Sequence, residues 1–246
     1  MFLKFRPLFF SLLFLLCLEI IVFRHDLVLI SGGMMLFISF LEGKSSGKNW
    51  RYSILPVFFT LSSIALLYLI TLVYEQQIFI ALAFFLFYLS LLGACRLGEY
   101  EGDQTAKGMN MATTSATIFF TYASFYGLYL NFLVPLYVLM LAYLVVTLLV
   151  SYQHFSLIKS NNKKTVWVYS FLLALAMAEL IWTMNFWPFG YLTTGVIALI
   201  LYYVLWDVIQ SHFLNLLSQK RVVANTVLFS ILVILILLTS KWIPVI

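Results

Sequence analysis

The stretch AELIWTMNFWPFGYLTTG, Ala178 to Gly195, joins two long apolar runs and decides how the chain is interpreted. Each run is long enough to be a helix that crosses a membrane, so the stretch is expected to hold the turn between two antiparallel spans. It carries a carboxylate, Glu179, in a segment that otherwise has the composition of a membrane interior. An ionisable group at that depth is costly, which makes Glu179 the first candidate for a functional residue.

The composition of the whole chain agrees with this interpretation. Of its 246 residues 64% are hydrophobic and only 9% are charged, and the mean hydropathy is +1.05. In a soluble domain about a quarter of the residues are charged. The gaps between apolar runs are too short to bury a core of their own. We therefore expect an all-α, polytopic integral membrane bundle that forms a single domain over residues 1–246.

Nine apolar runs are long enough to cross a hydrocarbon core of about 30 Å at about 1.5 Å per residue. They are residues 7–23, 27–41, 53–74, 78–97, 109–130, 132–152, 166–186, 189–206 and 222–238. The second run is short and holds Gly32 and Gly33, so it is either a full span or a re-entrant element.

The net charge of +5 is better explained by topology than by nucleic acid binding, because the basic residues are scattered in short gaps between the runs. With nine spans and a cytoplasmic N-terminus, only Arg24 and Lys241 of the fourteen basic residues fall outside. An excess of Lys and Arg on the cytoplasmic side is the usual bias, and it favours a full second span. The compact loops indicate a multi-pass protein of a bacterial cytoplasmic membrane, with the lipid bilayer as its surroundings.

Small or hydroxyl residues recur at every fourth position on two of the runs, a pattern that lets helices approach closely. They are Thr113, Thr117 and Thr121 on the fifth run and Ser170, Ala174 and Ala178 on the seventh. We expect these faces to be interior, and the very apolar run 222–238 to be peripheral.

Glu19 and Glu179 are predicted to lie at a similar depth. They follow Arg6 and Lys164 by about 20 and 22 Å at the helical rise. If the first and seventh helices are neighbours, the two acids form an intramembrane polar site, with Trp182 and Asn185 at its mouth. The alternative is two separate acids, each satisfied by a nearby hydroxyl or backbone carbonyl.

The loop RLGEYEGDQTAK, Arg96 to Lys107, places Glu99, Glu101 and Asp103 at alternate positions. Alternating acids in a glycine-containing loop can surround a divalent cation with oxygen ligands. The loop lacks the spacing of an EF-hand and the paired aspartates of a magnesium pyrophosphate site. A solvated connector is the alternative, and it is the one we favour.

Asp207 lies near the inner end of the eighth run, followed by Gln210, Ser211 and His212. Asp207 and His212 are five residues apart and about 140° apart around a helix, which is a poor arrangement for binding a metal. We expect a polar helix end at the membrane surface.

Three functions are compatible with these features. The first is a membrane scaffold or subunit that packs with partner helices, which we favour because catalytic residues are scarce. The second is a small proton- or cation-coupled transporter that uses Glu19 and Glu179. The third is an enzyme on a lipid-linked substrate, with the acidic loop as its metal site. The chain has no Walker A, GxSxG or HExxH motif, and we expect neither enzymatic activity nor a cofactor or metal.

Overall fold

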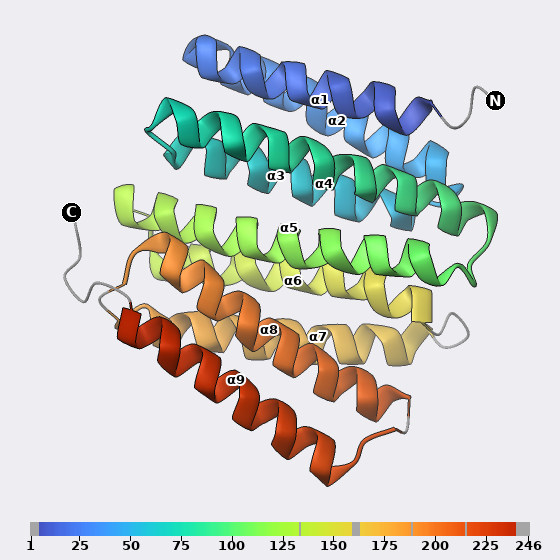
Figure 1. Ribbon diagram of the computed structural model, residues 1–246, viewed down its shortest axis with the longest axis vertical. Coiled ribbons are helices and arrows are strands. Elements are labelled where there is room, and N and C mark those ends of the chain that lie inside the picture. Colours follow the sequence, from blue (N-terminus) through green and yellow to red (C-terminus); the bar gives the residue numbers. More distant parts are fainter. Residues whose placement is uncertain (1–4, 133, 159–162, 188, 215, 240–246) are drawn as a thin grey trace. The chain divides into compact units, whose positions relative to one another are not determined.

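The computed structural model describes residues 5–132, 134–158, 163–187, 189–214 and 216–239, without the side chains of His25, Ile158 and Arg221. Over these ranges the chain is all α (Figure 1). Its helices are α1 Arg6–Phe23, α2 Val28–Gly47, α3 Ile54–Leu69, α4 Val73–Glu99, α5 Gln104–Asn131, α6 Leu136–Ile158, α7 Lys163–Met184, α8 Tyr191–Phe213 and α9 Gln219–Thr239, with short 3-10 helices η2 His25–Leu27 and η3 Trp50–Ser53. The predicted all-α class is confirmed for the described residues.

Eight of the described helices are long and apolar enough to cross a membrane, and α5 is the ninth helix. Residues 109–130, predicted as the fifth span, lie in α5, which is long but more polar. Its polar side chains Asn110, Thr113, Thr117 and Thr121 are all buried. A helix whose polar face is covered by protein needs less apolar surface than one that faces lipid.

The second predicted run is a continuous helix without a break at Gly32 and Gly33. It continues past the predicted end at Leu41 as far as Gly47, 20 residues in all, which is about 30 Å at the helical rise. Lys48 then ends the helix in the left-handed conformation, with φ 58°. The continuous helix is long and apolar enough to cross a membrane, which favours the full span over the re-entrant alternative.

The turn between α3 and α4 lies earlier than the polar residues of the sequence predict. The prediction ended the third span at Tyr74, but α3 ends at Leu69 and α4 begins at Val73. The side chain of Gln76 explains this difference, since its Nε2 donates a hydrogen bond to the carbonyl oxygen of Ile70 at 2.7 Å. The polar residues thus form the first turn of α4 and satisfy the backbone of the preceding turn.

The described residues divide into two compact units, one up to Thr121 and one from Tyr122 onward. The core of the first unit is a cluster of phenylalanines. Phe14 of α1 stacks on Phe87 of α4 with ring centroids 4.4 Å apart, and Phe59 of α3 lies against both. Phe120 of α5 completes the cluster beside Phe59. These rings pack α1, α3, α4 and α5 against one another in the first unit.

In the second unit α7 packs most extensively against α6. The stripe of Ser170, Ala174 and Ala178 on α7 is buried, as predicted, and lets the two helices approach closely. The helix α8 approaches α5 in the same way, because a Cβ added to Gly195 would lie 2.8 Å from the Cβ of Ala123. Small residues therefore set helix spacing within this unit.

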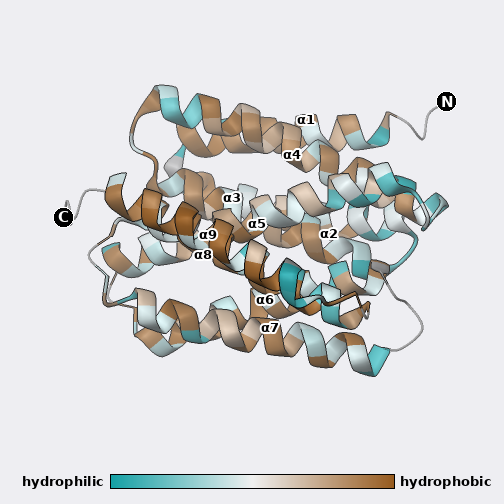
Figure 2. Cartoon of the chain, turned by 60° about the horizontal axis from the view of Figure 1, so that its bottom comes forward, coloured by the Kyte–Doolittle hydropathy of each residue, from teal (hydrophilic) through white to brown (hydrophobic). Residues whose placement is uncertain are grey.

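The last helix, α9, is peripheral, as predicted. None of the residues of its apolar window, Val222–Thr239, is buried. Figure 2 shows α9 as hydrophobic along most of its length, with its hydrophilic residues near its start. An exposed helix of this composition suits contact with lipid or with another apolar helix.

Candidate functional site

Glu179 lies on an exposed face of α7. The residues Val168, Leu172, Leu175 and Trp182 share this face and are 50%, 50%, 38% and 49% exposed. Together with Glu179 they form a row that we call the α7 seam, in which the steps between successive residues alternate between four and three. Such a 3.5-residue repeat is the pattern by which one helix packs along another. Glu179 is the single charged position in it.

The described part of the chain offers Glu179 neither a hydrogen bond nor an ion pair. Its neighbours along the seam, Leu175 and Trp182, present apolar surface one turn to either side. Trp182 packs edge-on against Phe186, with ring centroids 5.6 Å apart. Glu179 therefore lies between an aliphatic segment of the seam and an aromatic pair at the end of the helix.

The rest of the predicted intramembrane site is placed as follows. Asn185 follows the end of α7 and is half-buried, with its backbone N–H bonded to the carbonyl of Ile181 at 3.0 Å. Trp182 shares the exposed face with Glu179, whereas Asn185 belongs to the turn. The structure thus brings Glu179 and Trp182 together on one helix face.

Glu19 lies on α1 in the first unit and is half-buried. One of its carboxylate oxygens accepts a hydrogen bond from Nε2 of Gln77 on α4 at 3.2 Å. This bond links α1 to α4 and gives the acid a local polar partner, which is a side-chain amide and not the hydroxyl or backbone carbonyl of the alternative interpretation. Glu179 belongs to the second unit, and its meeting with Glu19 stays a prediction.

The acidic loop does not form a metal site in the described part of the chain, where no three His, Cys, Asp or Glu side chains come together to hold an ion. Glu99 and Glu101 are exposed. Asp103 instead caps α5: its Oδ1 accepts hydrogen bonds from the backbone N–H groups of Thr105 and Ala106. Asp103 thus serves as a helix cap, while Glu99 and Glu101 face away from the protein interior.

Asp103 also forms an ion pair with Arg96, at 2.7 Å from both Nε and Nη2 of the guanidinium. The backbone N–H of Ala106, with further contributions from Arg96 and Thr105, lowers the pKa of the Asp103 carboxyl below its ordinary value of 3.8. The carboxylate thus favours the folded state.

We expect Asp103→Ala to lower the melting temperature of the purified protein in detergent by about 2–4 °C, as for a lost helix cap in a chain of this size. Because the folded-state pKa is depressed, the contribution of Asp103 is complete above pH 3.8 and is lost as the pH falls below that value. The melting temperatures of the wild type and Asp103→Asn should therefore approach each other as the pH is lowered from about 6 to about 3. Glu101→Gln is the matched control and should change little; an equal loss in both variants would contradict the capping role.

Asp207 is buried, with 7% of its surface exposed. This differs from the predicted polar helix end at the membrane surface. It accepts a hydrogen bond from the side chain of Asn225 on α9. His212 points elsewhere and bonds to the hydroxyl of Tyr169 on α7 at 2.9 Å. Asp207 therefore has a structural role in holding α9 to α8, because helix packing makes the carboxylate inaccessible to solvent.

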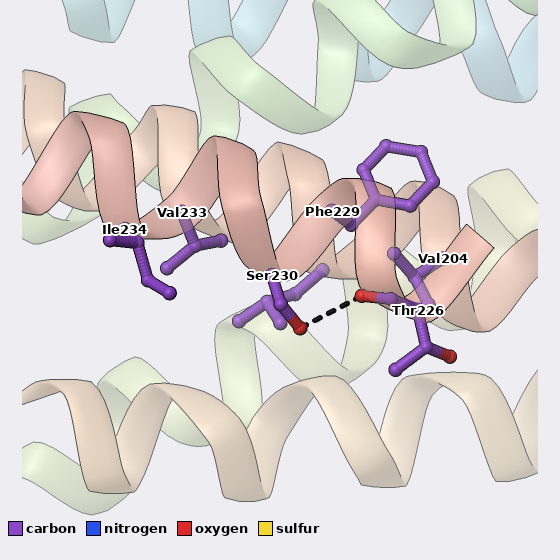
Figure 3. A pocket seen from close by; sticks show the side chains of 7 residues that line it. Val204, Thr226, Phe229, Ser230, Val233 and Ile234 are labelled. Carbon is purple, nitrogen blue, oxygen red and sulfur yellow. Dashed lines mark hydrogen bonds between the residues drawn. The ribbon is translucent and has the colours of Figure 1, made fainter. Parts of the chain in front are cut away.

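A groove of about 380 Å³ lies between α8 and α9 (Figure 3). It is lined by Leu201 and Val204 of α8 and by Thr226, Phe229, Ser230, Val233 and Ile234 of α9. The hydroxyl of Ser230 is already satisfied, since it donates to the backbone carbonyl of Thr226 at 2.8 Å. The walls are therefore suited to hydrocarbon and offer little to a polar ligand.

Glu42 is a buried acid that the sequence interpretation missed. It is 3% exposed, near the end of α2. One carboxylate oxygen lies 3.6 Å from Nη2 of Arg6 on α1, and the other accepts a hydrogen bond from Ser46 at 3.0 Å. Glu42 follows the predicted run directly, and Gly43 and Gly47, four residues apart, were the available signal that the helix continues in a close contact.

A buried hydroxyl network in the second unit was also missed. The hydroxyl of Tyr143 donates to the backbone carbonyl of Tyr122 at 2.9 Å, and the hydroxyl of Tyr122 bonds to Thr147 at 2.9 Å. Further along α6, Ser151 bonds to the hydroxyl of Tyr202 on α8 at 3.2 Å. Tyr143, Thr147 and Ser151 recur at every fourth position, so the rule applied to the fifth and seventh runs would have found them.

The described part of the chain is an α-helical protein in which eight helices are long and apolar enough to cross a membrane, which suggests a multi-pass membrane protein. A family model described as a protein of unknown function, DUF5656, matches residues 27–239. The chain belongs to this family. The matched segment contains Glu42, Asp103 and Glu179, whereas Arg6 and Glu19 precede it. No curated protein and no solved structure matches the chain.

Proposed function

We propose that this protein is a subunit or scaffold of a membrane complex, and that its α7 seam packs against a transmembrane helix of a partner protein. The observation that carries the proposal is Glu179, an acid without a hydrogen bond in the described part of the chain, in an exposed row of apolar residues. We place the nine helices across a bacterial cytoplasmic membrane, with the N-terminus inside and α5 shielded from lipid by the chain.

Exposed apolar surface would not support this proposal by itself. Lipid tails are as apolar as leucine, so the bilayer can cover the exposed apolar faces of α9 and the groove beside it without a partner protein. A carboxyl group is different, because lipid offers it no hydrogen bond donor. An acid at the centre of a spanning helix costs about 2.5–3.5 kcal/mol in insertion measurements, and the cost is smaller toward the membrane surface.

The depth of Glu179 follows from its aromatic neighbours. Trp favours the headgroup level of a membrane. Glu179 precedes Trp182 by three residues, or about 4.5 Å along the helix axis, on the side of the apolar segment. In this topology the acid lies at the outer edge of the hydrocarbon region, where a partner helix can cover it.

The small residues of α7 do not serve the partner. Ser170, Ala174 and Ala178 are buried within the second unit, where α7 packs on α6. A bulky substitution at Ala174 therefore tests folding of the chain and not assembly. The partner contact is assigned to the opposite face, at Val168, Leu172 and Leu175.

The transporter alternative has less support. It requires Glu19 and Glu179 to face one cavity, but the carboxylate of Glu19 already accepts a hydrogen bond from Gln77. It also makes a clear prediction of its own. Cysteines replacing Glu19 and Glu179, in a chain with Cys17 and Cys95 removed, would then form a disulfide within one molecule, and this result would contradict the placement of a partner at Glu179.

Photocrosslinking in the native membrane tests the proposal. A photoreactive amino acid replaces Leu175 of the full-length chain, and the control carries it at Ile231, an exposed position of α9. We expect one discrete adduct from position 175, with mass spectrometry locating the crosslink in a transmembrane helix of the second protein. Adding Glu179→Leu should reduce its yield about tenfold, as for an interhelical polar contact of about 1.4 kcal/mol.

Two results would overturn the proposal. The first is that position 175 yields only lipid adducts in native membranes. The second is that positions 175 and 231 yield the same adducts with equal efficiency, because capture would then be independent of the seam.

A further inference from the structure

We infer that the helix seated on the α7 seam carries one basic side chain, a lysine or an arginine, at the depth of Glu179. This inference rests on the proposed function and names the chemistry of the partner. It is drawn from the composition of the seam, which combines aliphatic and aromatic contact positions with a single acid.

The first argument is the hydrogen-bonding capacity of Glu179. An ionised carboxylate only accepts hydrogen bonds. A lysine or arginine supplies both donors and the opposite charge, and hydrogen bonds between ionised groups are about twice as strong as those between neutral groups. At the poorly hydrated edge of the hydrocarbon region, such a side chain satisfies the acid more completely than a hydroxyl or an amide does.

The second argument excludes a second copy of this chain as the occupant. A symmetric dimer would bring the same face of both copies together. Glu179 would then meet the Glu179 of the other copy, and two like charges oppose each other. The remaining seam positions Val168, Leu172 and Leu175 have no side-chain donor, and Trp182 offers one neutral N–H. One indole per copy does not compensate two facing acids.

The third argument is the register of the contact. The seam repeats every 3.5 residues, which favours a left-handed crossing of about 20° with interlocking side chains. A single polar position in such a seam fixes how two helices align, at some cost in stability. Glu179 has this position in the seam, between Leu175 and Trp182. The basic residue of the partner is thus expected opposite Glu179, with apolar residues one turn further toward the membrane centre.

The test uses the full-length protein in phosphatidylcholine vesicles, which carry no net charge, with the photoreactive amino acid at position 175. The probes are synthetic transmembrane peptides of leucine and alanine that differ at one position, which holds Lys, Leu or Glu at the depth of Glu179. We expect the Lys peptide to give about ten times more adduct than the Leu peptide, and the Glu peptide to give the least. In the Glu179→Gln protein the Lys peptide should fall to the level of the Leu peptide, and Glu179→Lys should reverse the preference toward the Glu peptide.

Equal adduct yields for the Lys and Leu peptides with the wild-type seam would overturn the inference. So would a preference for Lys that survives in Glu179→Gln, since it would not depend on the acid. Melting curves check that the variants fold, and the probe at Ile231 should show no preference among the peptides. The two proposals fail separately: a native-membrane adduct without a Lys preference removes only the basic partner residue, whereas a Lys preference without any native adduct removes the partner protein.

Discussion

Gly47→Ala is expected to destabilise the first unit by about 2–3 kcal/mol, the usual cost of forcing extra atoms into a packed contact. A Cβ at this position would lie 2.3 Å from both Cβ and Cγ of Tyr52, closer than carbon atoms can approach. The side chain of Tyr52 is buried and has little room to move away. The backbone cannot retreat on the other side, because Gly98 of α4 already lies against Gly47. Denaturation by SDS from mild detergent micelles would measure the loss.

Gly33→Ala is the matched control in the same helix. A Cβ at Gly33 would meet nothing within 4 Å. Alanine favours a helix over glycine by up to about 1 kcal/mol, so this variant should be neutral or slightly more stable. Equal losses of stability in Gly47→Ala and Gly33→Ala would show that the contact of α2 with Tyr52 and Gly98 is not the cause of the loss.

These two glycines also show how far the sequence predicts the fold. The pair Gly32 and Gly33 raised the alternative of an interrupted second span, yet nothing crowds Gly33 and the helix passes through both residues without a break. Gly47 matters more and lies beyond the predicted end of the run. The apolar run ends at Leu41 because Glu42 follows. Hydropathy cannot indicate that a helix continues through a buried acid, which here is paired with Arg6 and Ser46.

The partners of individual polar residues were beyond prediction for a related reason. Apolar runs reveal that helices exist, but the lateral order of helices depends on side-chain contacts between segments far apart in sequence. Glu19 accepts a hydrogen bond from Gln77, and Asp207 accepts one from Asn225, in each case from another helix. Asp103 was grouped with its neighbours in the loop, but its position just before α5 made a helix cap the stronger interpretation.

Glu179 shows what the sequence can predict of a candidate site and what it cannot. The sequence singled it out as an acid within an apolar run, and the structure places it on an exposed face of α7. What the sequence did not reveal is the face itself, because almost every position of α7 is apolar. The burial of Ala174 and Ala178 identifies the inner side of the helix, and only then does the α7 seam become visible.

Arg6→Leu is expected to destabilise the first unit by about 1–3 kcal/mol, because it removes the ion-pair partner of the buried Glu42 and leaves Ser46 as the hydrogen bond donor to its carboxylate in the described part of the chain. The loss should be smaller than the roughly 3–5 kcal/mol found when a fully buried ion pair is broken. The reason is that the side chain of Arg6 is 48% exposed and its nitrogen lies 3.6 Å from the carboxylate. Arg24→Leu, at the exposed other end of α1, is the control and should stay within about 0.5 kcal/mol of the wild type.

The double variant Arg6→Leu/Glu42→Leu separates the pair from its surroundings. Removing both charges replaces a partly desolvated ion pair by apolar side chains, an exchange that is often neutral in protein interiors. The double variant should therefore be more stable than the sum of the single losses implies, with a coupling of about 1–2 kcal/mol in SDS denaturation. Strictly additive losses would mean that Arg6 stabilises α1 through its bond to Ser45 and its aliphatic chain, and that Glu42 is satisfied within α2 alone.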